Sequence, residues 1–321
     1  MMFGLAGVSH SSFQPNILQE TAVNMSSSSH TKDELATLGA GTLFGVNGMV
    51  AAITGGGSGI GLMMAKALAA NGAEKIYILG RRKEVLEEAA ASVGPNVVPL
   101  VCDVTSKDSL RAAAAAIEKE SGFLNLLVCN AGVGGPQVKA APAEMTAAEW
   151  AEQHLAHDTA DYSRVFDVNV TSVWYTTMAF LSLLDLGNKK GNLFQSSQVV
   201  STSSIGAFNK KAPGGWAYGQ SKAAATLLIK HLSSNLPQWN IRANCIAPGL
   251  FPSEMSAPIA KLYSADGSVP KEMVPMQRMG DTQDMAGVML YLASRAGAYC
   301  NGSVITVDGG RLGNFPTTWH A

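Results

Sequence analysis

The chain lacks any long apolar segment of the kind that forms a membrane-spanning helix. No run of about 18 or more apolar residues occurs, which excludes a transmembrane helix of ordinary length. An excess of charge of one sign is also absent, because 23 lysines and arginines balance 24 aspartates and glutamates, for a formal net charge of −1. Such a balance gives no field that would attract nucleic acid or an anionic membrane surface. We therefore expect neither nucleic acid nor a membrane among the partners.

Cysteine is scarce, and targeting signals are missing from the first residues. The four cysteines are widely spaced and form no C-x-x-C pair, which argues against a disulfide framework. Residues 1–45 contain no basic stretch ahead of an apolar segment, so no secretory signal is expected. They also contain no arginine and include acidic residues, which argues against a transit peptide. The sequence therefore predicts a cytoplasmic protein with reduced thiols.

What the chain does contain is a high apolar content arranged in short runs. Hydrophobic residues make up 47% of the 321 positions and charged residues 15%, which suits a sizeable core and excludes a wholly disordered chain. Apolar runs alternate with helical stretches along the chain. The predicted strands are 49–54, 75–79, 96–102, 124–129, 199–203, 241–246 and 304–307, and the predicted helices are 60–71, 82–92, 107–120, 166–184, 215–236 and 282–294.

This alternation predicts the fold class. Strands that are apolar along their whole length and separated by helices indicate an α/β protein with a parallel sheet covered on both faces. Right-handed crossovers then give a doubly wound sheet that binds ligands at the carboxyl ends of its strands. We predict one such domain over 46–321, with a substrate lobe at about 250–280. Residues 1–45 are predicted to form an N-terminal arm, flexible or packed on a partner subunit.

A glycine-rich loop lies between the first predicted strand and the first predicted helix. Its spacing is G-x-x-x-G-x-G rather than the commoner G-x-G-x-x-G. Glycines permit a tight turn and let a pyrophosphate approach the backbone, and the helix N-terminus that follows offers free N–H groups to it. A merely flexible loop is the alternative, but the strand–turn–helix setting favours a dinucleotide. The predicted cofactor-binding residues here are Thr54, Gly55, Ser58, Gly59, Ile60 and Gly61.

The end of the second predicted strand indicates which dinucleotide binds. An acidic residue at this point binds the ribose 2′-hydroxyl of NAD, whereas an arginine accommodates the 2′-phosphate of NADP. The strand ends without an acidic residue and is followed by Arg81 and Arg82. Because a guanidinium matches phosphate geometry, we predict NADP(H) as cofactor, with Arg81 as the main phosphate ligand. Arg82 is assigned to the cofactor too, although a solvated helix start would also explain it.

Tyr218 and Lys222 lie four residues apart at the start of a predicted helix and so share one face. A free tyrosine has a pKa of about 10, and a neighbouring ammonium lowers it toward the range useful for acid–base catalysis. The spacing alone is common, and an exposed helical pair would usually explain it. Its significance comes from Ser204 at the end of the fifth predicted strand, where a hydroxyl can hold a substrate carbonyl oxygen. Ser203 beside it is a second candidate.

Taken in order, these motifs resemble the short-chain dehydrogenase/reductase family in its compact form. The resemblance covers about residues 46–312, and it implies a Rossmann fold and a hydride-transferring enzyme. Within the family, residues 80–82 and 248–253 resemble those of fungal 3-oxoacyl-carrier-protein-reductase-like enzymes, many of them in specialised metabolism. The matching positions are the glycine loop, Asp103, Asn130-Ala131-Gly132, Asn169, Ser204, Tyr218 with Lys222, and Pro248-Gly249.

The resemblance implies a role for each matching residue. Tyr218 would protonate the carbonyl oxygen as hydride arrives, and Lys222 would lower the tyrosine pKa and bind the nicotinamide ribose. Ser204 would orient the carbonyl, and Asn169 would hold a water that continues the proton relay from Lys222. The other implied cofactor contacts are Asp103 and Val104 at the adenine, Asn130, Ala131 and Gly132 in the cleft, and Pro248, Gly249 and Ser253 beside the nicotinamide.

The substrate is predicted from the methionine-rich segment near 250–280. Flexible thioethers adapt to irregular apolar shapes, although ordinary loop packing would also explain them. We therefore predict NADPH-dependent reduction of a carbonyl in a hydrophobic or polycyclic small molecule. A scaffold that catalyses imine reduction or a non-redox step, and a non-catalytic cofactor sensor, are the alternatives. The methionines concerned are Met255, Met273, Met276 and Met279.

Two further expectations concern metal ions and assembly. His154 and His157 are spaced as a metal pair would be, but no acidic or cysteine cluster joins them, so no metal is predicted. The apolar faces of the helices around 173–184 and 223–236 are of the kind that family members bury between subunits. The resemblance thus implies a homodimer or homotetramer.

Overall fold

The computed structural model describes residues 35, 37–137, 145–212, 215–257 and 268–315. The chain divides into a short unit, Met1–Gly39, and a compact unit, Ala40–Ala321. Most of the N-terminal arm expected over 1–45 lies outside the described residues. The last part of that range forms helix α2 (Ala40–Phe44), which belongs to the compact unit.

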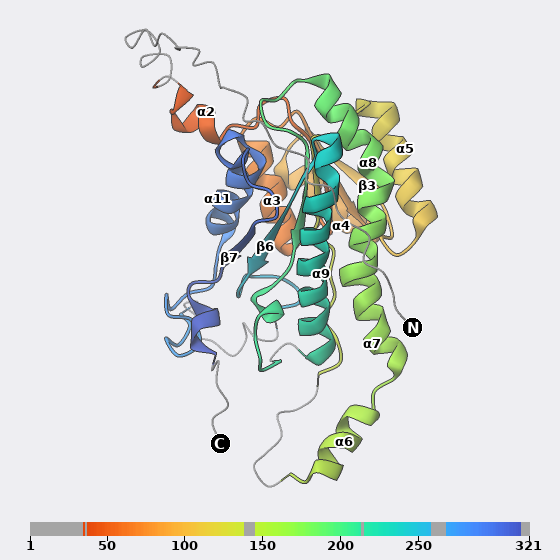
Figure 1. The fold of residues 1–321 in the computed structure, drawn as a ribbon, viewed down its shortest axis with the longest axis vertical. Coiled ribbons are helices and arrows are strands. Elements are labelled where there is room, and N and C mark those ends of the chain that lie inside the picture. The colour runs from red at the N-terminus through yellow and green to blue at the C-terminus, as the bar shows by residue number, and fades with distance from the viewer. Residues whose placement is uncertain (1–34, 36, 138–144, 213–214, 258–267, 316–321) are drawn as a thin grey trace, which may run out of the picture. The chain divides into compact units, whose positions relative to one another are not determined.

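A parallel sheet forms the centre of the compact unit (Figure 1). Neighbouring strands all pair in parallel, in the order β3-β2-β1-β4-β5-β6-β7. The strand order reverses between β1 and β4, which opens a crevice at the carboxyl ends of the strands. This topology confirms the predicted doubly wound α/β fold. The strands are β1 (Val50–Thr54), β2 (Lys75–Gly80), β3 (Val97–Val101), β4 (Leu126–Cys129), β5 (Gln198–Thr202), β6 (Arg242–Pro248) and β7 (Val304–Val307).

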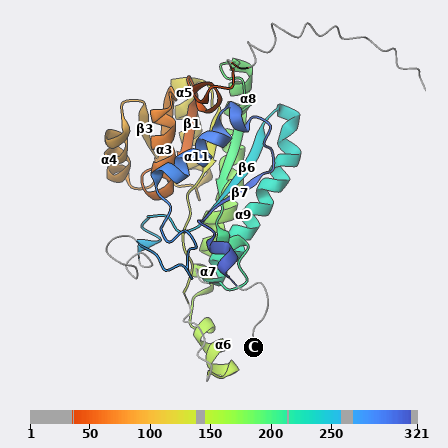
Figure 2. The same cartoon turned by 90° about the vertical axis from the view of Figure 1, so that its left-hand side faces the viewer.

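Helices cover both faces of the sheet (Figures 1 and 2). Ala51 and Ile53 of β1 pack with helices α3, α4 and α11, whereas Val50 and Ala52 point to the opposite face and pack with α5, α8 and α9. Because successive side chains of a strand alternate between its faces, one strand supplies both cores. The helices are α3 (Gly59–Ala70), α4 (Lys83–Val93), α5 (Lys107–Ser121), α6 (Ala147–Leu155), α7 (Thr159–Phe166), α8 (Ser172–Lys190), α9 (Trp216–Asn235) and α11 (Thr282–Ala293).

Short irregular helices complete the architecture. A π-helical turn, η1 (Asp167–Thr171), separates α7 from α8. The long helical region predicted to contain 166–184 is therefore interrupted by this turn and ends with α8 at Lys190. Helix α6 was not predicted; Figures 1 and 2 show it projecting from the end of the unit where the strands finish. The 3-10 turns are η2 (Ile205–Ala207), η3 (Leu236–Trp239), η4 (Arg295–Gly297) and η5 (Arg311–Asn314).

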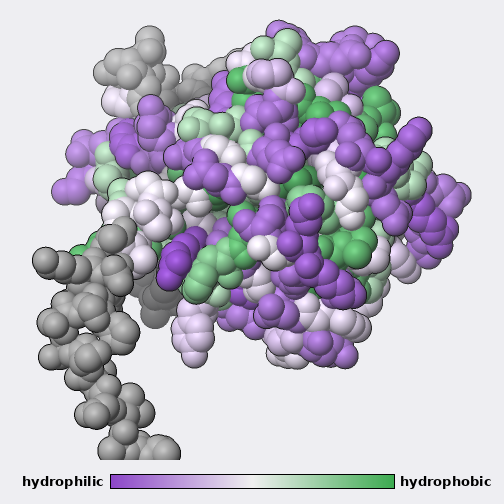
Figure 3. Space-filling model, turned by 90° about the horizontal axis from the view of Figure 1, so that it is seen from above, coloured by the Kyte–Doolittle hydropathy of each residue, from purple (hydrophilic) through white to green (hydrophobic). Residues whose placement is uncertain are grey.

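The surface agrees with a core that lies between sheet and helices. Figure 3 shows hydrophilic residues over much of one end of the molecule, with apolar residues in small patches between them. Among the helices that the structure describes, none is both long and apolar enough to cross a membrane.

Candidate active site

A cleft of about 1460 Å³ runs along the carboxyl ends of the strands. It exceeds the roughly 300–1,000 Å³ of a pocket for a drug-sized ligand, so it has room for a dinucleotide together with a substrate. Nearly all the site residues predicted from the sequence line it. The exceptions are Thr54, Gly61 and Asn169, which lie directly behind its wall.

The glycine loop forms one half of the cleft and is built to receive a phosphate. Gly55 and Gly59 have φ values of 65° and 50°, in the left-handed region that favours glycine. Ser58 is the N-cap residue of α3, but its side chain makes no capping hydrogen bond. The first N–H groups of α3 therefore lack a side-chain acceptor from their own cap, and with the helix dipole they suit a pyrophosphate.

Thr54 and Asn130 brace this loop from behind. The Thr54 hydroxyl oxygen accepts hydrogen bonds from the backbone N–H groups of Asn130 and Ala131, both at 3.0 Å. The Asn130 amide in turn donates to the carbonyl oxygens of Thr54 at 3.1 Å and Gly55 at 3.2 Å. Thr54 was predicted to contact the cofactor. In the structure its hydroxyl holds the ends of β1 and β4 together.

Two arginines flank the far end of the cleft, beyond β2. Arg82 forms an ion pair with Glu254, 2.7 Å from nitrogen to oxygen. Arg81 lines the cleft and forms no ion pair within the described part of the chain. Hydrogen bonds from Thr105 hold the pKa of Asp103 below its usual value, and the positive charge of Arg81 contributes to the lowering. Of the two guanidiniums, Arg81 is the one left for an anionic ligand.

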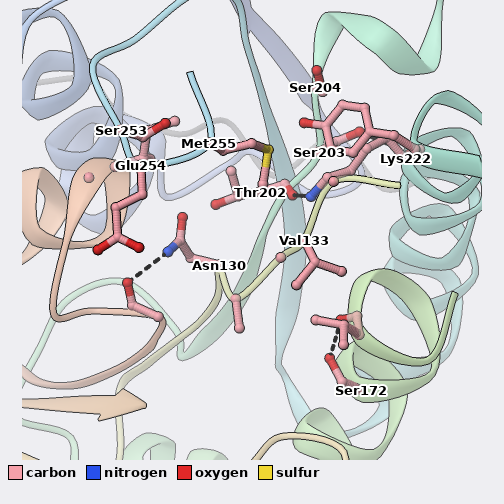
Figure 4. Close-up of a pocket in the computed structure, with 18 of the residues that line it drawn as sticks. Asn130, Val133, Ser172, Thr202, Ser203, Ser204, Lys222, Ser253, Glu254 and Met255 are labelled. Carbon is pink, nitrogen blue, oxygen red and sulfur yellow. Dashed lines mark hydrogen bonds between the residues drawn. The ribbon is translucent and has the colours of Figure 1, made fainter. Parts of the chain in front are cut away.

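Tyr218, Ser204 and Lys222 converge at the other half of the cleft. The Ser204 hydroxyl accepts from the Gly206 N–H at 3.0 Å, and the half-buried Tyr218 ring lies against the same glycine: a Cβ on Gly206 would be 3.3 Å from the Ser204 Oγ and 3.4 Å from the Tyr218 Cε1. Lys222 is buried, and its ammonium donates to the Thr202 carbonyl oxygen at 2.7 Å (Figure 4). Helix α9 and the end of β5 thus bring together a hydroxyl, a phenol and an amine.

The structure separates the two candidate serines. The Ser203 hydroxyl donates to the Lys222 carbonyl oxygen at 3.0 Å and lies 2.6 Å from the Thr226 hydroxyl, so it is engaged by α9. The Ser204 hydroxyl lines the cleft beside Tyr218, where burial raises the pKa of the phenol and Ser204 offsets part of the rise. The arrangement favours Ser204 as the group that contacts a substrate.

Asn169 occupies the π-helical turn η1 and is buried. Its side-chain oxygen accepts from the Val133 N–H at 2.9 Å, and its amide donates to the Val133 carbonyl oxygen at 3.0 Å and to the Ser221 hydroxyl at 2.9 Å. These bonds tie the strand end after β4 to the helix that carries Tyr218. Both donors of the Asn169 amide are engaged in these bonds, and its oxygen accepts one hydrogen bond.

Comparisons with known proteins agree with this geometry. A family model described as enoyl-(acyl carrier protein) reductase matches residues 55–311. Short-chain dehydrogenase/reductase PhomF of Diaporthe leptostromiformis is 45% identical over 286 residues, which cover 87% of this chain and 97% of PhomF. Short-chain dehydrogenase/reductase VdtF of Byssochlamys spectabilis is 43% identical, over 88% of this chain and 98% of VdtF. The chain belongs to the short-chain dehydrogenase/reductase family.

A solved structure of the same family extends the comparison. The Pseudomonas aeruginosa RhlG/NADP active-site complex superposes with a TM-score of 0.70 at 29% identity, over 84% of this chain and 98% of that one. The predicted family, fold and oxidoreductase class are thereby confirmed. Short-chain dehydrogenase/reductases use NAD(P)(H), and three features fit such a cofactor: the N-terminus of α3 without a side-chain cap, the glycines with positive φ, and Arg81, which forms no ion pair with any described residue.

The expected effect of Lys222 on Tyr218 is not what the structure shows. Burial raises the pKa of Tyr218, and the nearby Ser204 hydroxyl offsets part of that rise. Burial lowers the pKa of Lys222 to about 8, and its nitrogen lies 5.8 Å from the centre of the tyrosine ring. Desolvation of each group therefore outweighs the attraction between ammonium and phenolate.

Sequence reasoning missed several groups that line the cleft. Within the part of the chain that the structure describes, the buried Thr202 hydroxyl has no hydrogen-bond partner. Arg164 from α7 and Arg311 from η5 add guanidiniums to those of Arg81 and Arg82. Thr202 is the last residue of β5, and Arg311 follows β7 after the turn Asp308-Gly309-Gly310, so closeness to a strand end was the signal available for these two. Of the methionines expected to shape the substrate site, only Met255 lines the described cleft, and Met276 is 63% exposed. Part of the expected lobe, 258–267, lies outside the described residues.

The low pKa of Lys222 predicts a pH dependence of stability. Its pKa is about 8 in the folded protein against the ordinary 10.5, so between these values the unfolded chain binds more protons. The free energy of unfolding therefore rises with pH in this interval, by at most about 1.4 kcal/mol per unit. We expect Lys222→Met to lose this rise, as measured by urea unfolding at pH values of about 8 and about 9.

A matched control is Lys230→Met, which removes an exposed lysine from the same helix and should keep the wild-type slope. Buried thiols oppose the rise at higher pH, since burial raises the pKa of Cys129 to about 12. For that reason the measurement is the difference between the variants. Equal slopes for wild type and Lys222→Met would contradict the assignment of a low pKa to Lys222.

Proposed function

We propose that the protein is an NADPH-dependent reductase that transfers hydride to the carbonyl of a hydrophobic or polycyclic small molecule. Tyr218 is the proton donor of this reaction. The observation that carries the proposal is the placement of the Tyr218 phenol, the Ser204 hydroxyl and the Lys222 ammonium in one cleft with a glycine loop that fits a dinucleotide.

In this reaction the bound cofactor supplies the hydride, and the protein supplies position and the proton. The Ser204 hydroxyl holds the carbonyl oxygen, and the Tyr218 phenol donates its proton to that oxygen, so that a carbonyl becomes an alcohol. A tyrosine, with an ordinary pKa of about 10, keeps its proton at neutral pH and so has a proton to donate. A positively charged Lys222 stabilises the phenolate that remains.

The preference for NADPH is supported by the end of β2. Arg81 lines the cleft and has no ion-pair partner within the described residues, whereas Arg82 is held by Glu254. The related RhlG structure is a complex with NADP. Physiological direction follows from the cofactor, since cells generally keep NADPH reduced, and reduction is the direction we propose.

Arg81→Ala is expected to weaken NADPH use and leave NADH use nearly unchanged. A charge-assisted hydrogen bond to a phosphate contributes about 1.5–3 kcal/mol, so kcat/KM with NADPH should fall roughly 10- to 100-fold. The measurement is steady-state kinetics with both cofactors for wild type and variant. A wild-type enzyme that prefers NADH would contradict the assignment of Arg81.

The proposed reaction is tested directly with a panel of aromatic and alicyclic ketones. NADPH oxidation is followed by absorbance, and the alcohol product is identified by mass spectrometry. Conversion of a ketone with equal consumption of NADPH supports the proposal. Product formation without NADPH consumption would instead favour a scaffold that catalyses a non-redox step, and turnover of imines alone would favour imine reduction.

We also propose a setting for this activity: specialised metabolism, in the cytoplasm, as a homodimer or homotetramer. The free cysteines support a reducing compartment. Exposed apolar side chains on α8 and α9, Trp174 at 42% and Leu227 at 56%, support burial against a second copy. Light scattering on the purified protein measures the assembly.

A further inference from the structure

Arg311 is a buried guanidinium at the substrate half of the cleft. It begins η5, directly after β7 and the turn Asp308-Gly309-Gly310, and it is 8% exposed while lining the cleft. Its Nη1 donates to the Met273 carbonyl oxygen at 3.2 Å, and its guanidinium carbon lies 5.3 Å from the centre of the Phe315 ring. A buried cation thus faces the cleft with an aromatic wall beside it.

No carboxylate balances this charge within the described part of the chain. The ion pairs there involve other residues, and the neighbouring Asp308 accepts instead from the backbone N–H groups of Gly310 and Leu312. Taking a guanidinium out of water without a counter-ion is costly, and such a group carries five N–H donors. An anionic ligand in the cleft would remove the imbalance.

Arg311 and the predicted site of the 2′-phosphate follow strands near opposite edges of the sheet. β7 is the edge strand next to β6, whereas Arg81 and Arg82 follow β2, on the other side of β1. Gly249, beside the predicted nicotinamide site, packs so closely on Asp308 that a Cβ would lie 2.6 Å from the Asp308 Cβ. Arg311 therefore belongs to the end of the cleft where substrate binds.

Each of the other cationic side chains in the cleft either has a bonding partner or lies at a different part of the cleft from Arg311. The Lys222 ammonium donates to the Thr202 carbonyl oxygen, and Arg82 pairs with Glu254. Arg81 and Arg164 act on Asp103 after β3, at the opposite end of the strand order. Lys107, at the start of α5 after β3, lies over the Tyr175 ring with its nitrogen 4.2 Å from the ring centre. Arg311 is thus the guanidinium placed to bind a negative group on the substrate.

We propose that Arg311 binds a carboxylate of the substrate, which makes the substrate a hydrophobic keto acid. This inference rests on the proposed carbonyl reduction and adds the charge of the substrate to it. A planar guanidinium binds both oxygens of a carboxylate at once. Phe315, Phe251 and Met255 line the same cleft and supply the apolar contacts for the body of the molecule.

The test compares one aryl ketone with and without a negative charge. The probes are 4-acetylbenzoate and its methyl ester, and their binding to the NADP⁺-loaded protein is measured by titration calorimetry. We expect the acid to bind roughly 10- to 100-fold more tightly than the ester. Arg311→Leu should remove this preference while affinity for the ester and for NADPH stays within about threefold, and Arg311→Lys should retain part of it.

Arg278→Gln is the matched control. Arg278 is also in the C-terminal part of the chain, but it does not line the cleft, and its guanidinium pairs with Asp284 at 2.5 Å. The preference for the acid should therefore remain in this variant. Equal binding of acid and ester, no binding of either, an unchanged ratio in Arg311→Leu, or loss of NADPH binding in that variant would each overturn the proposal.

The same probes separate this proposal from the proposed function. Selective binding of the acid without NADPH-dependent reduction of either ketone would leave the role of Arg311 standing and contradict the reductase. Reduction of both ketones with equal kcat/KM would support the reductase and contradict the role of Arg311.

Discussion

Tyr218→Phe is expected to abolish most carbonyl reduction while NADPH binding is retained. The substitution removes one hydroxyl, the group that donates the proton to the carbonyl oxygen in the proposed mechanism. Positioned proton donors contribute typically about 10²- to 10⁴-fold to a rate, so kcat should fall by that factor. The ring still fills its place on α9, so the fold and the glycine loop are unaffected. Steady-state kinetics and NADPH fluorescence titration measure the two effects separately.

A second tyrosine supplies the control for this substitution. Tyr162 is on α7, and its hydroxyl donates at 2.5 Å to the side chain of Gln220, which is on α9 with Tyr218. Tyr162 does not line the cleft. Tyr162→Phe should therefore keep kcat within about twofold. Retention of more than a tenth of the activity by Tyr218→Phe would mean that another group donates the proton. Loss of NADPH binding in that variant would mean that the phenol acts chiefly through the cofactor.

The central features of the fold could be predicted because they depend on local patterns. Apolar runs that alternate with helices determine a parallel sheet, and the observed strand bounds differ from the predicted ones by two residues at most. The glycine loop and the pair Tyr218 and Lys222 are likewise short-range patterns. The π-helical turn at Asn169 was not predicted, and the Asn169 side chain in it bonds to Val133, 36 positions away, which no local pattern shows.

Features that arise from burial and long-range pairing lay beyond the sequence. Arg82 and Glu254 are 172 positions apart, so their ion pair could not be read from either segment. The sign of the pKa shift at Tyr218 depends on how far desolvation exceeds the charge of Lys222, which is a property of the packed site. Three of the four methionines do not line the described cleft. The prediction failed for them because the composition of a segment does not tell which way each side chain points.

Gly61→Ala is expected to destroy the cofactor half of the site. A Cβ at this position would lie 2.3 Å from the Gly55 carbonyl oxygen and 2.6 Å from the Asn130 side-chain nitrogen. Neither can yield without breaking the bond by which Asn130 holds the glycine loop. Overpacking of this kind costs about 1–3 kcal/mol of stability. A loop displaced by about an ångström should weaken NADPH binding roughly 100-fold, as measured by fluorescence titration.

The control for this substitution is Gly287→Ala, since Gly287 is also helical, in α11, and has nothing within 4 Å of its Cβ position. Alanine there should raise stability by about 0.5–1 kcal/mol, because glycine is the poorer helix former, and should leave NADPH binding unchanged. The two variants make the same chemical change in the same secondary structure. Opposite signs of the stability change would therefore isolate the close approach of α3 to the glycine loop as the cause. Normal NADPH affinity in Gly61→Ala would mean that the dinucleotide does not depend on the conformation of this loop.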